Sequence, residues 1–281
     1  MRITLRHLTR YTYTRPVFIE PHTIRLTPRQ DACQRIVDHR LIIDPAPAGR
    51  WDGIDAEGNP FTQVWFDGLA PALTVEALTT AETLRDNPFA FLLTDAASLP
   101  PKFGPETLAA LAPCLRQTAG PDGAVAELAR DAASRAKGNG IDFLIELNTR
   151  IFNDVTKVVR REQGILPPET VCRERRGACR DSAALLIACS RLAGVPARFV
   201  SGYQVGGTES RDEHDLHAWA EAFLPGAGWI GLDPTHGLVV ADRHLALVAS
   251  HDPELAAPVR GSFRGAEAGA EMTHELELAF E

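Results

Sequence analysis

The chain has 281 residues, of which 44% are hydrophobic and 23% charged, as in an ordinary globular protein with one large domain or two smaller ones. Its net charge of −8 argues against nucleic acid or an anionic membrane surface as the main partner, because each of these requires a basic patch. No apolar run approaches the roughly 20 residues of a membrane span, and no secretory h-region follows Met1, so we expect a cytoplasmic protein without membrane association.

The first third of the chain carries strand signals. Five residues between positions 3 and 13 keep to odd positions, which is typical of a half-buried strand: Ile3, Leu5, Thr9, Tyr11 and Tyr13. A turn signal at 55–60 separates further short, β-branched segments. Several short strands with turns between them predict a small β-sandwich-like domain over residues 1–85. The further strands are expected at 36–37, 41–43, 61–66 and 73–79.

The pattern changes to helical spacing after Asn87-Pro88. Apolar residues recur about every 3.6 positions in three segments, and a long apolar run after Cys179 predicts a central helix that ends near Ala193, before Gly194. The first three helices are expected at 106–115, 124–137 and 141–161. Strands are expected at 197–203, 217–224, 229–232 and 272–280, with a polar loop at 206–215. The chain is therefore predicted to be an α+β protein.

The five cysteines are odd in number and scattered, and no two form a Cys-x-x-Cys pair. In a reducing compartment they should be free thiols, of which one or two at most should be reactive. They are Cys33, Cys114, Cys172, Cys179 and Cys189.

Three residues carry the functional prediction. Cys179 heads the apolar helix, His217 begins one expected strand, and Asp233 follows the next. A thiol attacks as the thiolate, and the positive end of a helix dipole and a nearby imidazolium both lower a thiol pKa. The imidazole in turn needs an acceptor that fixes its orientation. In this order the three residues are the candidate nucleophile, general acid/base and orienting acid of a thiol acyl-transfer enzyme, and the backbone N–H of Cys179 could bind the oxyanion.

The strands that carry His217 and Asp233 provide a geometric test. Side chains alternate between the faces of a strand, so the two residues share a face only if the numbers of paired residues have an even sum. Pairing of Leu224 with Trp229 would place Asp233 on the wrong face. We therefore predict a bulge or an odd-length loop at 225–228.

Each of these residues also has a plainer interpretation. A cysteine before an apolar helix is most often a small buried side chain, and a lone strand histidine is most often a satisfied core residue. Asp233 alone is an ordinary strand-end residue, and Asp181 suits the helix dipole without a catalytic role. A zinc site is a further alternative, although its spacing matches no usual pattern. That site would use Cys172, Cys179, His214 and His217.

Four segments closely resemble the bacterial transglutaminase-like family, and the similarity extends over nearly the whole chain. The segments are Gly177–Ala183, Pro196–Tyr203, His217–Glu221 and Gly228–Thr235. The resemblance implies a papain-like α+β core over residues 86–263, preceded by the β-sandwich-like domain and followed by a C-terminal loop and strand at 264–281. It also implies Cys179, His217 and Asp233 as the catalytic residues. Members often have asparagine where His236 stands.

The expected reaction is acyl transfer on an amide bond of a peptide or protein substrate, through a thioester on Cys179. An amine acceptor would make the protein a transglutaminase, and water would make it a protease or amidase. We find no calcium-binding loop and expect no cofactor and no metal. A non-catalytic peptide-binding module that keeps the fold is the alternative from another class. An acyl-CoA transferase would need a nucleotide pocket, and the sequence has no phosphate-binding glycine-rich loop.

Overall fold

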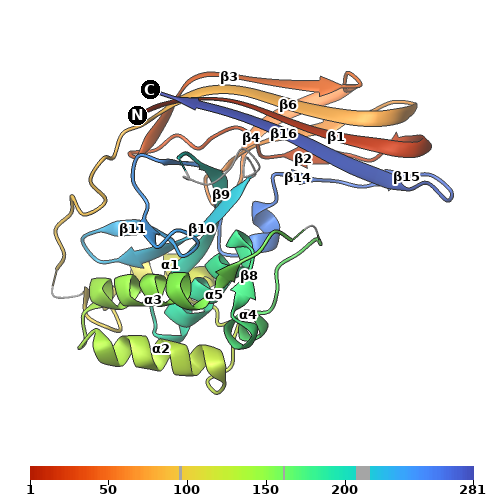
Figure 1. The fold of residues 1–281 in the computed structure, drawn as a ribbon. Helices are drawn as coiled ribbons and strands as arrows, with labels where there is room; N and C mark the ends of the chain where they lie inside the picture. The colour runs from red at the N-terminus through yellow and green to blue at the C-terminus, as the bar shows by residue number, and fades with distance from the viewer. Residues whose placement is uncertain (95–96, 161, 207–215) are drawn as a thin grey trace.

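The computed structural model describes residues 1–94, 97–160, 162–206 and 216–281. It confirms the α+β class: two antiparallel sheets form one end of the molecule, and helices packed on a third antiparallel sheet form the other (Figure 1). Among the described residues, no helix is long and apolar enough to span a bilayer. All five cysteines lie in the described part and are free thiols, as expected.

The two N-terminal sheets form the β-sandwich-like part. One has the order β15-β1-β6-β3, with β16 also paired to β1, and the other has the order β14-β2-β5-β4. Along β1, Ile3, Leu5 and Tyr13 are buried, which confirms the alternation expected between residues 3 and 13. The first six strands are β1 (Arg2–Ile19), β2 (His22–Ile24), β3 (Gln34–Asp44), β4 (Gly49–Ile54), β5 (Pro60–Trp65) and β6 (Leu69–Thr83).

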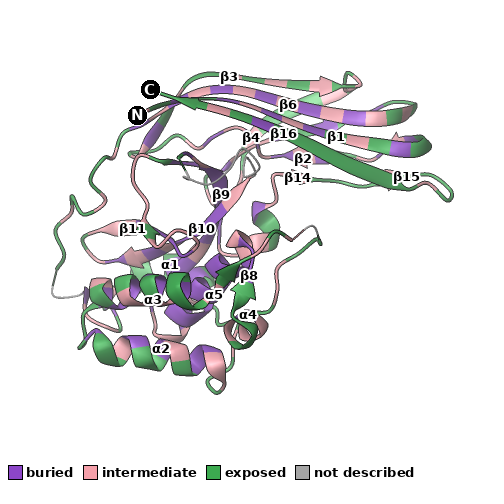
Figure 2. Cartoon of the chain, viewed as in Figure 1, coloured by how far each residue is buried: buried purple, intermediate pink, exposed green. Residues whose placement is uncertain are grey.

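The C-terminal strands return to these sheets. Strand β16 runs antiparallel to β1 over almost its whole length, pairing Ile3 with Phe280 and Tyr13 with Ala270. It is mostly exposed (Figure 2). The start and the end of the chain therefore share one sheet, and the expected limits at 85 and 264 stay a prediction. The C-terminal strands are β14 (Val259–Arg260), β15 (Phe263–Arg264) and β16 (Ala270–Phe280).

The core is built around one buried helix, α5, which packs against strands β9 and β10 of a sheet with the order β12-β11-β10-β9-β13. Helix α5 ends at Leu192, and Gly194 follows with a φ of +78°, so the expected helix end is confirmed. The core strands are β9 (Ala197–Gln204), β10 (His217–Leu224), β11 (Gly228–Asp233), β12 (Leu238–Val239) and β13 (His244–Ser250), followed by the 3₁₀ turn η2 (Pro253–Ala256). The helices are α1 (Pro105–Leu115), α2 (Ala124–Arg135), α3 (Gly140–Asp154), α4 (Pro168–Glu174) and α5 (Cys179–Leu192).

One predicted helix is too long. The helix expected over 141–161 is α3, and it ends at Asp154. Strand β7 (Thr156–Lys157) follows and pairs in parallel with β8 (Arg176–Gly177). Three β-branched residues, Val155, Val158 and Val159, accompany this change, and such residues favour extended backbone once a neighbouring strand supplies hydrogen bonds. The pairing brings the chain after α3 beside the residues just before Cys179.

The N-terminal part holds the free edge of β13 with two side-chain amides. Gln34 donates to the carbonyl of Ala246 and accepts its N–H, both at 2.7 Å. Asn59 does the same with Ala249, at 3.0 and 2.8 Å. Gln34 and Asn59 are buried, so each amide replaces a missing strand partner and satisfies backbone groups that burial would otherwise leave unpaired. This fixes the position of β13 relative to the N-terminal sheets.

Candidate active site

Cys179 is the first residue of α5, the most deeply buried helix of the core. Ala178 precedes it in an extended conformation, and the following turns of the helix are buried. Cys179 itself remains partly exposed. The thiol therefore stands at the accessible, positive end of a buried helix dipole, where an anion is favoured.

His217 is brought to this thiol by the first residue of β10. The imidazole of His217 and the backbone N–H of Ala218 both face the thiol of Cys179, and both lower its pKa. The ring of Trp219 stacks on His217 with centroids 6.3 Å apart. Trp219 lies so close to Gly202 on β9 that a Cβ there would come within 2.6 Å of its ring, which explains the glycine.

Asp233 ends β11 on the same face as His217. Phe223 pairs with Trp229 and Leu224 with Gly228, so paired numbers sum to an even value and the loop at 225–227 has three residues. The predicted odd-length loop is confirmed. A His217 ring nitrogen, Nε2, lies 2.8 Å from Asp233 Oδ2.

The structure thus brings the three predicted site residues together, with His217 between the Cys179 thiol and the Asp233 carboxylate. Nε2 of His217 contacts Asp233, which leaves its other ring nitrogen for Cys179. The three side chains come from the head of α5, the start of β10 and the end of β11. Their catalytic roles remain a prediction.

The pKa shifts of Cys179, His217 and Asp233 favour the charged form of each group. Burial works to raise the pKa of Cys179, but the hydrogen bond and charge of His217 outweigh it and hold the thiol pKa below 9.0. Burial works to lower the pKa of His217, but the Asp233 carboxylate raises it to about 10. Burial likewise opposes ionisation of Asp233, yet His217 and the hydrogen bonds of neighbouring histidines keep its pKa well below 3.8. Each pKa is therefore shifted toward the charged form of its group, which is the thiolate of Cys179, the imidazolium of His217 and the carboxylate of Asp233.

Two more histidines reach the same carboxylate. His236 Nδ1 lies 2.8 Å and His244 Nε2 3.0 Å from Asp233 Oδ2, while the N–H of Thr235 donates to Oδ1 at 2.9 Å. From the sequence, His236 was noted only as an unusual residue, and His244 was not selected at all. The signal for His244 was available: an ionisable residue directly precedes the apolar run at 245–249, and such a residue requires a polar partner where the strand is buried.

Asp181 does more than complement the helix dipole. Its buried carboxylate accepts from the N–H of Ala178 at 2.9 Å and of Leu166 at 2.8 Å, and from Nη1 of Arg160 at 2.8 Å. Arg180 donates to the carbonyls of Gly164 and of residues 160 and 162. The first turn of α5 therefore anchors the segment that follows β7.

A metal ion could be shared by part of this cluster. Ligand atoms of His217, Asp233 and His236 lie within 4.8 Å of one another. However, Asp233 already accepts N–H bonds from both imidazoles, and a metal would have to displace those protons. At a pKa of about 10, His217 keeps both of its ring protons at neutral pH. We therefore assign no metal to the cluster.

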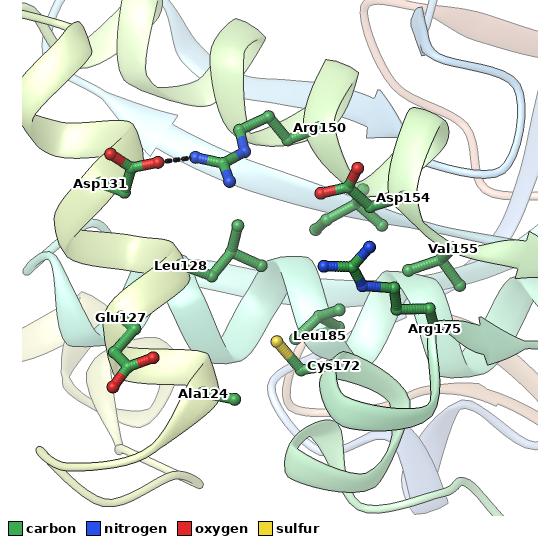
Figure 3. Close-up of a pocket in the computed structure, with 11 residues that line it drawn as sticks. Ala124, Glu127, Leu128, Asp131, Arg150, Asp154, Val155, Cys172, Arg175 and Leu185 are labelled. Atoms are coloured by element: carbon green, nitrogen blue, oxygen red, sulfur yellow. Dashed lines mark hydrogen bonds and ion pairs between the residues drawn. The ribbon is translucent and has the colours of Figure 1, made fainter.

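The residues of the zinc alternative are not all described: His214 lies outside the described residues. Cys172 lies on α4 and lines a pocket of about 280 Å³ between α2, α3 and α4 (Figure 3). Both acidic and basic side chains line that pocket, and Arg150 is paired there with Asp131. Leu185, which also lines it, is about 9 Å along α5 from Cys179. None of the predicted catalytic residues lines this pocket.

Comparisons with known proteins agree with this geometry. A model of the bacterial transglutaminase-like N-terminal region matches residues 3–82, and a model of the transglutaminase-like superfamily matches residues 126–234. An uncharacterized protein of Mycobacterium tuberculosis is 30% identical, over 92% of this chain and 87% of its own length. A protein-glutamine gamma-glutamyltransferase of Pseudomonas aeruginosa is 38% identical over 68 residues, which is 22% of this chain and 10% of that protein.

A solved structure, a proposed cysteine protease of Cytophaga hutchinsonii, shares the fold. Its TM-score is 0.68 at 19% identity, over 99% of this chain and 92% of that one. A cysteine at the head of a buried helix, packed on an antiparallel sheet, defines the papain-like class of core. Within that class, the chain belongs to the bacterial transglutaminase-like family.

Cys179 should react with iodoacetamide at neutral pH before the other thiols. Its pKa is lowered, so its alkylation rate should rise at a lower pH than that of Cys33, Cys114 or Cys172, whose pKa values burial raises. Mass spectrometry of labelled peptides between about pH 5 and pH 9 measures this order. Alkylation of Cys179 no faster than that of Cys33 or Cys114 would contradict a working thiolate.

Proposed function

We propose that the protein is a thiol acyl-transfer enzyme that acts on amide bonds of peptide or protein substrates. The observation that carries the proposal is the arrangement of the helix-borne thiol of Cys179 beside His217, which in turn is hydrogen-bonded to Asp233. The pKa of Cys179 is lowered and that of His217 is raised, and both shifts favour the nucleophilic thiolate. A peptide-binding module would have no need for a thiol whose pKa is lowered by a neighbouring imidazole.

In the proposed first step, the Cys179 thiolate attacks the amide carbonyl and a carbon–sulfur bond forms. The N–H groups at the head of α5 favour the negative charge that develops on the carbonyl oxygen. His217 gives its proton to the amide nitrogen, the carbon–nitrogen bond breaks, and ammonia or an amine leaves. A thioester on Cys179 and a neutral His217 remain, and Asp233 keeps the histidine in the tautomer that this transfer requires.

In the second step, neutral His217 takes a proton from the acceptor. Attack by an amine on the thioester yields a new amide, and attack by water yields a carboxylic acid; either returns the thiolate and the imidazolium. The Cys179, His217 and Asp233 arrangement serves both acceptors. The acceptor is selected by how well the surroundings of the thioester exclude water.

The test compares wild type with Cys179→Ala on a glutamine-containing peptide, with and without a primary amine. Cys172→Ala is the matched control, because this thiol is also partly buried but lies on α4. We expect ammonia release or amine incorporation by wild type and Cys172→Ala and none by Cys179→Ala. Peptide cleavage that depends on Cys179 would select the protease form. No Cys179-dependent product from the glutamine side chain or the peptide bonds would overturn the proposal.

A further inference from the structure

The Asp233 carboxylate receives four donors from three separate segments of the core. Oδ1 accepts the N–H of Thr235, and Oδ2 accepts a ring N–H from His217, His236 and His244. His217 begins β10, His236 follows β11, and His244 begins β13. Four donors from three segments leave the carboxylate a single orientation.

This arrangement assigns the proton positions on the two additional rings. A carboxylate only accepts hydrogen bonds, so each ring must carry its proton on the nitrogen that faces Asp233. That nitrogen is Nδ1 in His236 and Nε2 in His244. Burial lowers the pKa of His244, so this ring is neutral and its Nδ1 is an acceptor.

The acceptor nitrogen of His244, Nδ1, indicates that this side chain does more than fill space in the core. His244 is 4% exposed, and within the described part of the chain its Nδ1 is buried without a hydrogen-bond partner. An unpaired buried acceptor destabilises a fold, whereas an apolar side chain at this position would not. What the imidazole offers and an apolar side chain could not is the hydrogen bond from Nε2 to Asp233.

The surroundings of His244 hold its ring in place. Strand β13 is buried throughout, and the amides of Gln34 and Asn59 pair with its outer edge. The ring of Trp219 packs edge-on against His244 at 5.1 Å, while it stacks on His217. The N-terminal sheets therefore reach the catalytic aspartate through β13.

From these contacts we infer that His244 and His236 are positioning residues, which hold Asp233 as the fixed acceptor for His217. The inference rests on the proposed function. Without the two donors, Asp233 would be free to rotate away from Nε2 of His217, and the imidazolium–thiolate pair would lose part of its stabilisation. His244 should contribute more than His236, because His236 lies in a turn and its side chain is 24% exposed.

Amide substitutions test this inference at both positions with little change in size. The side-chain nitrogen of glutamine lies where Nε2 of histidine lies, and that of asparagine lies near Nδ1. His244→Gln should keep the donor to Asp233 and His244→Asn should lose it. At position 236 the order reverses, so that His236→Asn keeps the donor and His236→Gln loses it.

The readouts are turnover of the glutamine peptide and the pH profile of Cys179 alkylation. We expect His244→Asn to lower kcat about 10–100-fold with little change in KM, and to move the alkylation profile to higher pH. His244→Gln should restore both, and the variants of His236 should show the opposite order with a smaller effect. Circular dichroism and thermal unfolding establish that each variant is folded, and the two folded amide variants at 236 give the same comparison if one at 244 does not fold.

Two results would overturn the inference: equal behaviour of Asn and Gln at both positions, or a folded His244→Asn with wild-type turnover and a wild-type alkylation profile. Failure of the proposed function looks different. A wild-type protein with a reactive Cys179 but no amide turnover would refute the substrate class, while the alkylation profiles would still rank the variants. A purely structural role would change stability alone and would not reverse the Asn–Gln order between the two positions.

Discussion

Asp233→Asn should lower kcat about 10⁴-fold, the magnitude typical when the aspartate of a catalytic triad is replaced by its amide. In the native protein both carboxylate oxygens accept N–H bonds, one from Thr235 and the other from three imidazoles. An asparagine must turn its NH₂ group toward one of these two sets, so a donor faces a donor in either orientation. With the NH₂ group toward the histidines, His217 would have to accept at Nε2, and its remaining proton would then face the thiol of Cys179.

A histidine in that tautomer cannot take the thiol proton. The variant should therefore also lose the fast neutral-pH alkylation of Cys179, because the carboxylate that raises the pKa of His217 is gone. Steady-state kinetics and the alkylation profile measure the two effects. Asp131→Asn is the control, since Asp131 is a half-exposed aspartate that is paired with Arg150 on another face of the core. Retention of more than about a tenth of the wild-type kcat by Asp233→Asn would contradict an orienting role for this residue.

The candidate site could be found from the sequence because its signals are local. The apolar run after Cys179 defines the helix that presents the thiol, and strand alternation alone relates the faces of His217 and Asp233. The even register is a consequence of the three-residue loop at 225–227, which brings Gly228 opposite Leu224. The comparisons support the family, and the geometry brings the three residues together.

What the sequence did not predict depends on contacts between distant segments. The end of α3 is set by the parallel pairing of Thr156–Lys157 with Arg176–Gly177, which local spacing cannot reveal. The alternation at 272–280 indicates a strand, but not that the strand pairs with β1 at the other end of the chain. Likewise, the partner of His244 lies on β11, 11 residues earlier, at the opposite side of the sheet order from β13.

Asp181, in the first turn of α5, also has a partner that the sequence could not predict. The pattern of a first-turn acid is sufficient to predict a favourable dipole interaction. It says nothing of Arg160, which arrives from the segment after β7 and binds both carboxylate oxygens at 2.8 Å. The buried pair consequently has a larger expected effect than its local pattern suggests.

Asp181→Ala should lower the free energy of unfolding by about 3–5 kcal/mol, which is the usual cost of removing one partner of a buried ion pair. Asp181 is fully buried and the side chain of Arg160 is 15% exposed, so the substitution leaves a largely buried guanidinium without its counter-charge. The N–H groups of Leu166 and Ala178 lose their acceptor as well. Urea unfolding followed by circular dichroism measures the change.

A double-mutant cycle separates the charge from the packing. Asp181→Ala with Arg160→Ala should be less destabilised than the sum of the two single variants, because no unpaired charge remains buried. Asp142→Ala is the matched control: Asp142 is also an acid in the first turn of a helix, α3, but it is exposed, so its loss should cost less than about 1 kcal/mol. Additive single effects in the cycle would show that Asp181 acts on its backbone partners alone. A sub-additive cycle would instead identify the Arg160 pair as the contact that fixes the segment after β7 against the first turn below Cys179.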